Sequence, residues 1–345
     1  MVAKVRFALI GAGNMGRSNA TRIRRDGRGE IVAICDASID VAKHVGAELQ
    51  VPAVFSKVEE LLCSATRFEA AVISTPNALH APIAVRLLEA GKHVYCEKPP
   101  AIDLEGAERI CAACARASGA LMFGFNQRFD PWAQYVKRQI EAGVLGTIYH
   151  AQTQWHRRLW TASFGTWFTD KRLSGGGPLI DIGIHRLDQT LWLMGFPKIL
   201  SVSAVVYDNL AAAESERIGK ACTVEDFSAA LLRLEGGASL MLQASYLSYL
   251  PLDASEMSTL IMGEKCGFLE GGGMLRQMYN QGTLSHDIII NQYDVPPVTP
   301  MGSFIDHILD GTPSPSTPQQ GLEIMRVIDA IYRSAASGKE VRLNE

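Results

Sequence analysis

The sequence predicts an α/β chain of two domains, in which a doubly wound parallel sheet is followed by an α+β domain with a mainly antiparallel sheet. In residues 1–125, apolar strand-like runs alternate with helical segments, as a parallel sheet with crossover helices requires. After residue 126, most strand-like runs follow one another directly. The chain has 345 residues, which is the length of about two domains.

The first domain is expected to span residues 1–125. Its strand-like runs are Val5–Ile10, Ile31–Cys35, Ala70–Ser74, His93–Glu97 and Leu121–Phe125. Its helical segments are Met15–Arg25, Ile39–Val45, Val58–Leu62, Ala78–Glu89 and Leu104–Ala117. The motif Thr75-Pro76-Asn77 follows a strand, so we expect it at the carboxyl edge of the sheet, where ligands bind in such folds.

The second domain is expected to span residues 126–345, with terminal helices that can pack back on the first domain. Its early segments are a helix at Asp130–Glu141, a strand at Thr147–Arg158, a glycine-rich loop at Leu173–Gly177 and a helix at Ile184–Met194. Later strands are Ile199–Tyr207, Val224–Glu235, Ala238–Ser245, Thr259–Met262 and His286–Ile290. Gly236-Gly237 predicts a two-residue hairpin turn. The last elements are helices at Met301–Leu309 and Gln319–Ser337 and a short final strand.

The apolar run Phe7–Ile10 ends in a Gly-x-Gly-x-x-Gly motif, which predicts a dinucleotide site of the Rossmann type. Gly11 permits the tight turn out of the strand, and Gly13 leaves room for a pyrophosphate beside the backbone. Gly16 allows the following helix to pack closely, and that helix directs unpaired N–H groups at the phosphates. A glycine-rich turn without a ligand is the alternative. The expected contacts of this turn are Gly11, Gly13, Asn14, Met15 and Gly16.

Asp36 ends the next strand-like run and is the expected ribose contact. A carboxylate accepts hydrogen bonds from the ribose hydroxyls and repels a 2′-phosphate. The alternative is a solvated acidic residue at a strand end. No arginine follows at once to receive a phosphate, so the sequence favours NAD over NADP.

The composition indicates a globular protein and gives no sign of a nucleic acid or membrane partner. Apolar residues make up 47% of the chain, and the formal net charge is −3. No apolar run approaches the roughly 20 residues that span a bilayer, and the first strand begins too early for a signal peptide. Seven scattered cysteines fit reduced thiols in the cytoplasm. Cys111-x-x-Cys114 lies in a helical run without a second ligand pair, so no metal site is expected.

The segment from Cys96 to Pro100 contains a charged pair, Glu97-Lys98, at the end of a buried strand. Buried charges are costly unless they are paired or used. Lys98 precedes Pro99, so its backbone is held away from the helical region, and a cis bond there would fix its direction further. A lysine beside a nicotinamide can donate a hydrogen bond to a reacting oxygen. A surface Lys-Pro turn is the alternative interpretation.

A second charged group follows the glycines at 175–177. Asp181 and His185 are four residues apart and Asp188 is three further on, so in a helix the three share one face. A carboxylate near a histidine orients it and stabilises its charged form. Histidine titrates near neutrality, which suits a base that removes a hydroxyl proton during hydride transfer. A satisfied core histidine is the alternative.

Together these residues resemble the Gfo/Idh/MocA family of oxidoreductases, which includes inositol dehydrogenases and glucose–fructose oxidoreductase. The resemblance covers essentially the whole chain. Members of this family have an N-terminal Rossmann domain and a second domain with a large open sheet. One face of that sheet commonly forms an oligomer interface. The markers are Gly11-x-Gly13-x-x-Gly16, Thr75-Pro76-Asn77 with His80, Glu97-Lys98-Pro99, Asn126-x-Arg128-Phe129-x-Pro131 and Asp181-x-Gly183-x-His185-x-x-Asp188.

The resemblance implies roles for these residues. Lys98 would contact the reacting hydroxyl, Asp181 would position the substrate and His185 would be the acid–base group. Asn77 and Glu97 would lie along the nicotinamide half of the cofactor. Asn126-Gln127 departs from many relatives, which leaves substrate contacts from that strand open. The further cofactor contacts are expected at Thr75, Pro76, Asn77, His80, Glu97 and Lys98.

An aromatic segment at residues 155–168 is a candidate substrate wall. Sugar rings stack their C–H faces on tryptophan, while their hydroxyls need polar partners such as arginine. Subunit contacts or core packing are equally open as explanations. The expected substrate contacts are Lys98, Arg128, Trp155, Arg158, Trp167, Asp181 and His185.

The sequence therefore predicts a cytoplasmic NAD-dependent dehydrogenase that oxidises a secondary hydroxyl of a cyclic polyol, sugar or glycoside. The family resemblance further implies a homodimer or homotetramer that assembles through the C-terminal sheet. Two alternatives stay open: a glycosidase of the same family that retains NAD, and a non-enzymatic sugar sensor. The intact Lys98, Asp181 and His185 speak against the sensor.

Overall fold

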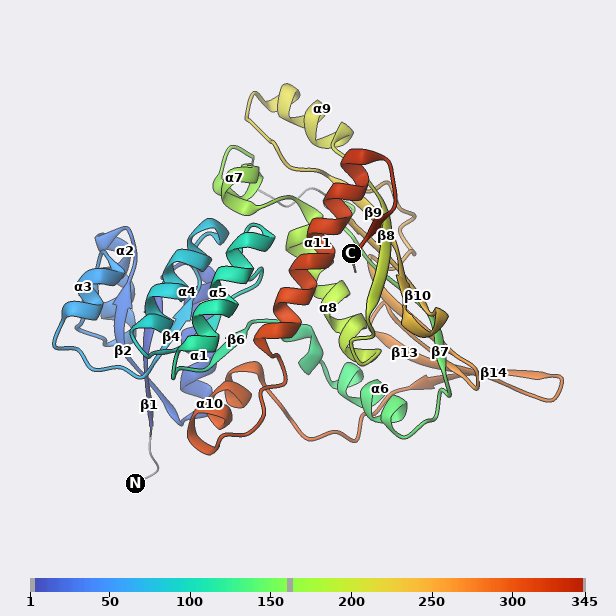
Figure 1. Cartoon of the computed structure of the whole chain (residues 1–345), viewed down its shortest axis with the longest axis horizontal. Coiled ribbons are helices and arrows are strands. Elements are labelled where there is room, and N and C mark those ends of the chain that lie inside the picture. Colours follow the sequence, from blue (N-terminus) through green and yellow to red (C-terminus); the bar gives the residue numbers. More distant parts are fainter. Residues whose placement is uncertain (1–3, 160–163, 344–345) are drawn as a thin grey trace. The chain divides into compact units, whose positions relative to one another are not determined.

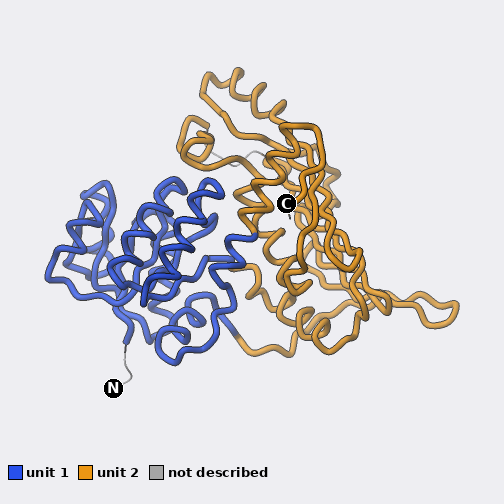
Figure 2. Tube along the Cα trace, viewed as in Figure 1, with its two compact units in different colours: residues 1–125, 298–323 blue, residues 126–297, 324–345 orange. Residues whose placement is uncertain are grey.

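The computed structural model describes residues 4–159 and 164–343, and the chain divides into two compact units (Figures 1 and 2). The first unit contains residues 1–125 and 298–323, and the second contains residues 126–297 and 324–345. The chain thus returns to the first unit late in the sequence, after most of the second unit is complete. Helix α11 (Pro318–Ser337) begins in the first unit and continues into the second.

The described part of the first unit holds a six-stranded sheet in the order β3-β2-β1-β4-β5-β6. Every strand pair is parallel, which confirms the predicted doubly wound sheet. The order reverses at β1, so the carboxyl ends of β1 and β4 flank the switch point where such folds bind ligands. The strands are β1 (Val5–Ile10), β2 (Gly29–Cys35), β3 (Val54–Phe55), β4 (Ala70–Ile73), β5 (His93–Cys96) and β6 (Leu121–Phe123). The helices are α1 (Asn14–Asp26), α2 (Ile39–Leu49), α3 (Val58–Cys63), α4 (His80–Glu89), α5 (Leu104–Arg116) and α10 (Pro300–Asp310).

Helix α10 is tied to this sheet although about 290 residues of sequence separate it from β1. Thr299 caps it by accepting a hydrogen bond from Gly302 N, and Pro300 occupies its first turn, where its missing N–H costs nothing. Phe304 is fully buried, and its ring centroid lies 6.3 Å from that of Phe7 and 5.7 Å from that of Tyr95. These contacts explain why residues 298–323 group with the first unit.

The described part of the second unit holds a nine-stranded sheet in the order β14-β13-β12-β11-β7-β10-β9-β8-β15. Only the β7–β10 pair is parallel, which confirms the predicted mainly antiparallel sheet. The strands are β7 (Ile148–His156), β8 (Ile199–Tyr207), β9 (Phe227–Leu234), β10 (Ser239–Ser245), β11 (Met257–Gly263), β12 (Gly267–Gly271), β13 (Met274–Gln281), β14 (Leu284–Ile290) and β15 (Val341–Arg342). The helices are α6 (Pro131–Glu141), α7 (Lys171–Ser174), α8 (Ile184–Leu193) and α9 (Asn209–Ile218).

Several elements of the second unit differ from the prediction. Strands β12 and β13 and helix α9 have no counterpart in the sequence reading, because their exposed or glycine-rich stretches lack a clear apolar alternation. The β9–β10 hairpin is confirmed, but its turn is longer than the predicted two residues and runs from Glu235 to Ala238. In the first unit, the two-residue strand β3 was also not predicted.

One face of the large sheet carries the helices, and within the described residues the other face lacks a helical layer (Figure 1). Helix α8 packs against β7, and Ser334 of α11 accepts a hydrogen bond from Ala204 N of β8. On the opposite face, the strand register aligns apolar side chains that are 37–50% exposed. Three of them are Val205, Tyr207 and Met241.

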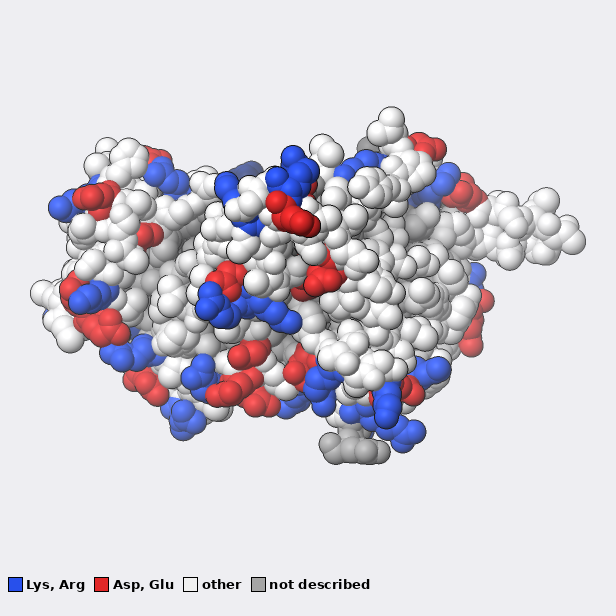
Figure 3. All heavy atoms as spheres, turned by 90° about the horizontal axis from the view of Figure 1, so that it is seen from above, with Lys and Arg blue, Asp and Glu red and all other residues white. Residues whose placement is uncertain are grey.

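None of the described helices is both long and apolar enough to cross a membrane. On the face of the molecule seen in Figure 3, basic and acidic side chains are interspersed. The described residues also contain no group of three or more His, Cys, Asp or Glu side chains placed to hold a metal ion.

Candidate active site

Two of the three glycines in the turn between β1 and α1 cannot be replaced without displacing backbone. Gly11 has φ +90°, and a Cβ there would lie 2.6 Å from Ser74 O. A Cβ on Gly16 would lie 2.1 Å from Gly11 O. A Cβ on Gly13, in contrast, would meet nothing within 4 Å. Gly11 and Gly16 therefore fix the turn, while Gly13 borders open space at the N-terminus of α1.

Asp36 is tied to this turn by backbone hydrogen bonds. Its Oδ2 accepts from Ala12 N at 2.8 Å, and its Oδ1 accepts from Ser38 N at 2.9 Å. The side chain is half-buried, and each carboxylate oxygen can accept a further hydrogen bond. The carboxylate is thus held beside the glycine turn with capacity left for hydroxyl donors.

The residues at the carboxyl edge of this sheet fit a dinucleotide. The first turn of α1 has no side-chain cap, so its backbone N–H groups suit a phosphate. Asn14 and Met15 are exposed in that turn. Thr75 Oγ1 is buried without a hydrogen-bond partner among the described residues, as expected for a hydroxyl that meets a ligand.

Asn19, which the sequence reading missed, joins the loops that follow β4 and β5. Its side-chain amide donates to Ser74 Oγ at 3.1 Å and to Glu97 Oε1 at 2.8 Å. Glu97 is only 7% exposed, and burial raises its pKa although Asn19 and Arg22 act in the opposite direction. Glu97 is therefore committed to α1, and we expect it to shape the cofactor loop more than to contact the nicotinamide.

His80 connects the Thr75-Pro76-Asn77 loop to the segment that carries Lys98. It is 1% exposed, and its two ring nitrogens lie 2.7 Å from Pro99 O and 3.0 Å from Thr75 O. Both nitrogens lie against backbone carbonyls, so His80 links the two loops, and its expected contact with the cofactor stays a prediction. Lys98 itself is half-buried, and the Lys98–Pro99 bond is cis.

In the second unit, Asp181 and His185 lie on one continuous helical run. Asp181 belongs to a π-helical turn (Leu179–Gly183) that leads directly into α8, which begins at Ile184. Asp181 is half-buried and His185 is 8% exposed. The run from Asp181 to His185 is helical, and its first turn is wider than an α-helical turn.

Aromatic side chains from two adjacent strands surround these residues. Trp155 of β7 pairs with Ala244 of β10, and its ring centroid lies 6.0 Å from that of His185. Tyr246, directly after β10, donates a hydrogen bond from its hydroxyl to Asp181 Oδ2 at 2.9 Å. The Arg157 guanidinium lies 5.6 Å from the Trp155 ring centroid and 5.8 Å from that of Tyr246. The structure therefore brings Asp181, His185 and Trp155 together, and adds Tyr246 and Arg157.

Two buried arginines fix the orientation of α8. Arg186 donates to Thr259 Oγ1 at 2.6 Å and to Gln127 Oε1 at 3.2 Å, and pairs with Glu270 at 3.5 Å. Arg128 forms a two-pronged ion pair with Asp188, and both side chains are at most 1% exposed. Breaking such a buried pair costs about 3–5 kcal/mol. Arg128 thus holds α8 and is not among the substrate contacts that we propose.

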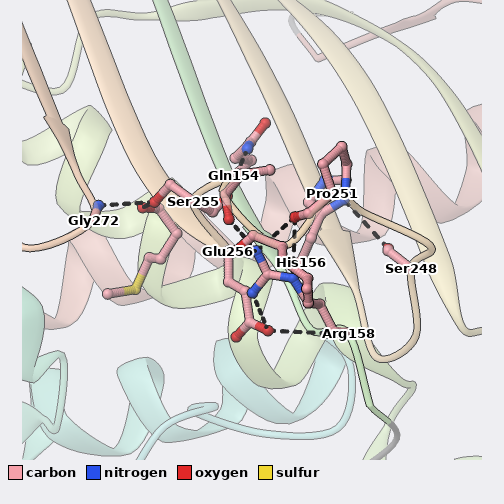
Figure 4. A network of polar contacts seen from close by, with 11 residues as sticks. Gln154, His156, Arg158, Ser248, Pro251, Ser255, Glu256 and Gly272 are labelled. Atoms are coloured by element: carbon pink, nitrogen blue, oxygen red, sulfur yellow. Dashed lines mark hydrogen bonds and ion pairs between the residues drawn. The ribbon is translucent and has the colours of Figure 1, made fainter.

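Arg158, an expected substrate contact, is held by several groups of the protein itself (Figure 4). Its guanidinium donates to Pro251 O at 2.9 Å, to Leu252 O at 3.2 Å and to Ala254 O, and it pairs with Glu256 at 3.0 Å. These four partners organise the loop before β11. Arg158 is therefore a loop anchor, whereas its neighbour Arg157 reaches the aromatic group around Asp181.

The glycines before Asp181 are required by steric contacts within the second unit. A Cβ on Gly176 would lie 1.9 Å from the Tyr332 hydroxyl, and one on Gly177 would lie 2.2 Å from Glu225 O. Glu225 is buried and accepts hydrogen bonds from Tyr332 Oη at 2.9 Å and from Leu179 N at 3.2 Å. This packing sets where the turn carrying Asp181 begins.

The remaining part of the aromatic segment is only partly described, since Trp160 lies outside the described residues. Trp167 is half-buried, and its ring centroid lies 4.8 Å from that of Phe168. Phe168 packs against the cluster of Ile182, Ala244 and Tyr246. Trp167 also lines a surface pocket with Lys171 and Thr223. It stays a candidate substrate contact.

Comparisons with known proteins relate this chain to one family of oxidoreductases. A model of the Gfo/Idh/MocA oxidoreductase family, NAD-binding Rossmann fold, matches residues 5–125, and a model of its C-terminal alpha/beta domain matches residues 137–343. D-glucoside 3-dehydrogenase of Escherichia coli (strain K12) is 30% identical over 353 residues, which cover 98% of this chain and 97% of that protein. Inositol 2-dehydrogenase of Rhizobium meliloti (strain 1021) is 24% identical, and the match covers 98% of this chain and 99% of that protein.

A solved structure supports the fold across the whole chain. The WlbA dehydrogenase from Bordetella pertussis, in complex with NADH and UDP-GlcNAcA, has a TM-score of 0.80 and 26% identity, and the match covers 99% of each chain. Two family models that together cover most of the chain, and a relative at 30% identity over nearly its full length, identify the family. This chain belongs to the Gfo/Idh/MocA family of oxidoreductases, with an NAD-binding Rossmann domain and a C-terminal α/β domain.

Proposed function

We propose that this chain is an NAD-dependent dehydrogenase that oxidises a secondary hydroxyl of a sugar, glycoside or cyclic polyol to a ketone. The observation that carries the proposal is the group formed by Asp181, His185 and Trp155. It combines a carboxylate, an imidazole and an aromatic face in one partly buried place. Carboxylates accept hydrogen bonds from several hydroxyls, and tryptophan faces stack on sugar rings.

Each residue has a separate role in the proposed reaction. His185 accepts the proton of the reacting hydroxyl, which a positioned imidazole can do near neutral pH. Lys98 donates a hydrogen bond to the reacting oxygen and stabilises negative charge on it. Asp181 accepts hydrogen bonds from substrate hydroxyls and holds the ring in place. NAD, when bound, accepts the hydride. The contacts that we propose for it are Gly11, Gly13, Asn14, Met15, Gly16, Asp36, Thr75, Pro76 and Asn77.

The relatives named above support the sugar and polyol class without fixing one compound. The test is to mix the purified protein with NAD and a panel of methyl glucosides, free aldoses and inositols, and to follow the absorbance of reduced nicotinamide. We expect the signal to grow with at least one class. Free sugar released from a nitrophenyl glycoside without net NADH would favour the glycosidase. The proposal would be overturned if the protein binds NAD but oxidises no compound of the panel, and if NADH also fails to reduce the corresponding ketones.

Replacing Asp36 with alanine tests the choice of cofactor. The carboxylate accepts from the glycine turn and, in our proposal, from the ribose hydroxyls. Its loss is expected to weaken NAD binding by about tenfold to a hundredfold, the value of one or two charge-assisted hydrogen bonds. Discrimination against NADP should relax at the same time. Fluorescence titration with both cofactors measures the two effects, and Asp40→Ala on α2 is a control. Unchanged NAD/NADP selectivity in Asp36→Ala would contradict the ribose role.

We further propose that the chain is a cytoplasmic homodimer or homotetramer that assembles through the helix-free face of the large sheet. Exposed apolar side chains in register on that face, among them Val205, Tyr207 and Met241, support the proposal. Burying such a patch is favourable by about 25 cal/mol per Å². Light scattering coupled to gel filtration should give a mass of two or four chains, and Met241→Asp should lower it. A wild-type mass of one chain at micromolar concentration would contradict it.

A further inference from the structure

Tyr246 forms a hydrogen bond to Asp181 from another element of the fold. Its hydroxyl donates to Asp181 Oδ2 at 2.9 Å, although 65 residues of sequence separate the two. The side chain is fully buried. Its ring belongs to the cluster of Ile182 and Ala244, against which Trp155 and Phe168 pack. The ring therefore cannot turn away from the carboxylate without disrupting that packing.

The charges around Tyr246 keep it a hydrogen-bond donor. Burial raises its pKa, and the neighbouring carboxylates of Asp181 and Glu225 raise it further, while Arg157 acts in the opposite direction. The raised pKa favours the protonated phenol, which donates its proton to Asp181 Oδ2. A hydrogen bond to an ionised acceptor is roughly twice as strong as a neutral one.

We propose that Tyr246 is a positioning residue that fixes the Asp181 carboxylate for substrate binding. The inference rests on the proposed function, because that function gives Asp181 the role of holding the substrate. A carboxylate on a half-buried helical turn has freedom about its last side-chain bond, and a rigid donor on one oxygen removes that freedom. The carboxylate then accepts hydrogen bonds from the substrate in one fixed direction. A fixed direction is needed to orient a bound ring.

Strand order explains how Tyr246 comes to this place. Alternation along β10 puts Leu240, Leu242 and Ala244 on the helix-bearing face, and Tyr246 continues that series two residues later. Because β10 is parallel to β7, Tyr246 follows β10 at the same end at which Trp155 stands in β7. The sheet thus presents a tyrosine and a tryptophan together to the run that carries Asp181 and His185.

The test compares Tyr246→Phe with Tyr332→Phe. Each variant removes only a hydroxyl that donates at 2.9 Å to a carboxylate in the second unit, that of Asp181 or that of Glu225. With the most active glycoside or inositol of the panel, Tyr246→Phe should raise KM about tenfold or more while the Kd for NAD stays constant. Tyr332→Phe should lower Tm without raising KM.

Asp181→Asn separates the two proposals. If Asp181→Asn keeps wild-type KM and kcat, the role of Asp181 in the proposed function fails. If it is impaired while Tyr246→Phe matches the wild type in KM, the positioning role alone is overturned. In the double variant, Tyr246→Phe should add little to the KM increase of Asp181→Asn, because its effect passes through Asp181. Independent, multiplicative effects would overturn the inference.

A second measurement does not depend on turnover. The difference in unfolding free energy between the wild type and Tyr246→Phe should be present at neutral pH and shrink in acid, as the Asp181 carboxylate becomes protonated. In an Asp181→Asn background this pH dependence should vanish. A difference that is constant with pH would show that the hydroxyl only packs, and would overturn the inference even if no substrate of the panel were turned over.

Discussion

Replacing Lys98 with alanine is expected to lower kcat/KM by about a thousandfold, because removal of one donor to a developing oxyanion costs roughly 10²–10³ in rate. The fold should survive the change. Lys98 is half-buried, and its neighbours are held independently: Glu97 by Asn19 at 2.8 Å and Pro99 O by His80 at 2.7 Å. The measurements are steady-state kinetics, NAD affinity by fluorescence and thermal stability.

Two further variants make the Lys98 result specific. Lys98→Arg keeps a positive charge but not the compact ammonium, so it should recover only a small part of the activity. Lys43→Ala on α2 removes an exposed lysine of the same unit and should be neutral. Turnover by Lys98→Ala within threefold of the wild type, with NAD bound normally, would rule out the proposed role of this lysine.

Replacing His185 with alanine is expected to lower kcat by about 10²–10⁴, the contribution typical of a positioned general base. The imidazole is 8% exposed and lies beside Trp155, so its removal leaves a small cavity next to the proposed substrate position. Imidazole added to the buffer should enter that cavity and restore part of the rate. Kinetics with and without imidazole, at saturating NAD, measure the effect.

A histidine elsewhere in the second unit provides the control. His150 on β7 is half-buried and has its Nδ1 2.8 Å from Ser239 Oγ, on the helix-free face of the sheet. His150→Ala should leave kcat unchanged and should not respond to imidazole. Equal losses in the two variants, or normal turnover in His185→Ala, would mean that His185 is not the base.

Much of the first unit was predictable because its signals are local. The glycine turn, the first two apolar runs and Asp36 lie within about 36 residues of the N-terminus, and backbone sterics alone dictate Gly11 and Gly16. The structure confirms the parallel sheet and the position of Asp36 beside the turn. Within this local frame, the sequence did not reveal that Asn19 donates to Glu97 or that both His80 nitrogens face backbone.

The second unit was less predictable because its decisive contacts join distant residues. The sequence did not show that Arg128 pairs with Asp188, 60 residues away. It also did not show that Arg158 anchors a loop 93 to 98 residues away. Tyr246 belongs to no recognisable sequence motif, although strand alternation places it on the helix-bearing face. The sequence alone does not show whether a charged residue pairs with a ligand or with another side chain.

The sequence by itself determined the fold class, the dinucleotide turn and the helical spacing of Asp181 and His185, since each depends on residues close together in the chain. Only the tertiary structure decided which charges are available for chemistry. Packing pairs Arg128 with Asp188 and commits Arg158 to a loop, and it brings Tyr246 and Trp155 to Asp181 and His185. The physical reason is that a buried charge is costly unless it is paired, and the sheet register determines which partners lie close enough to pair with it.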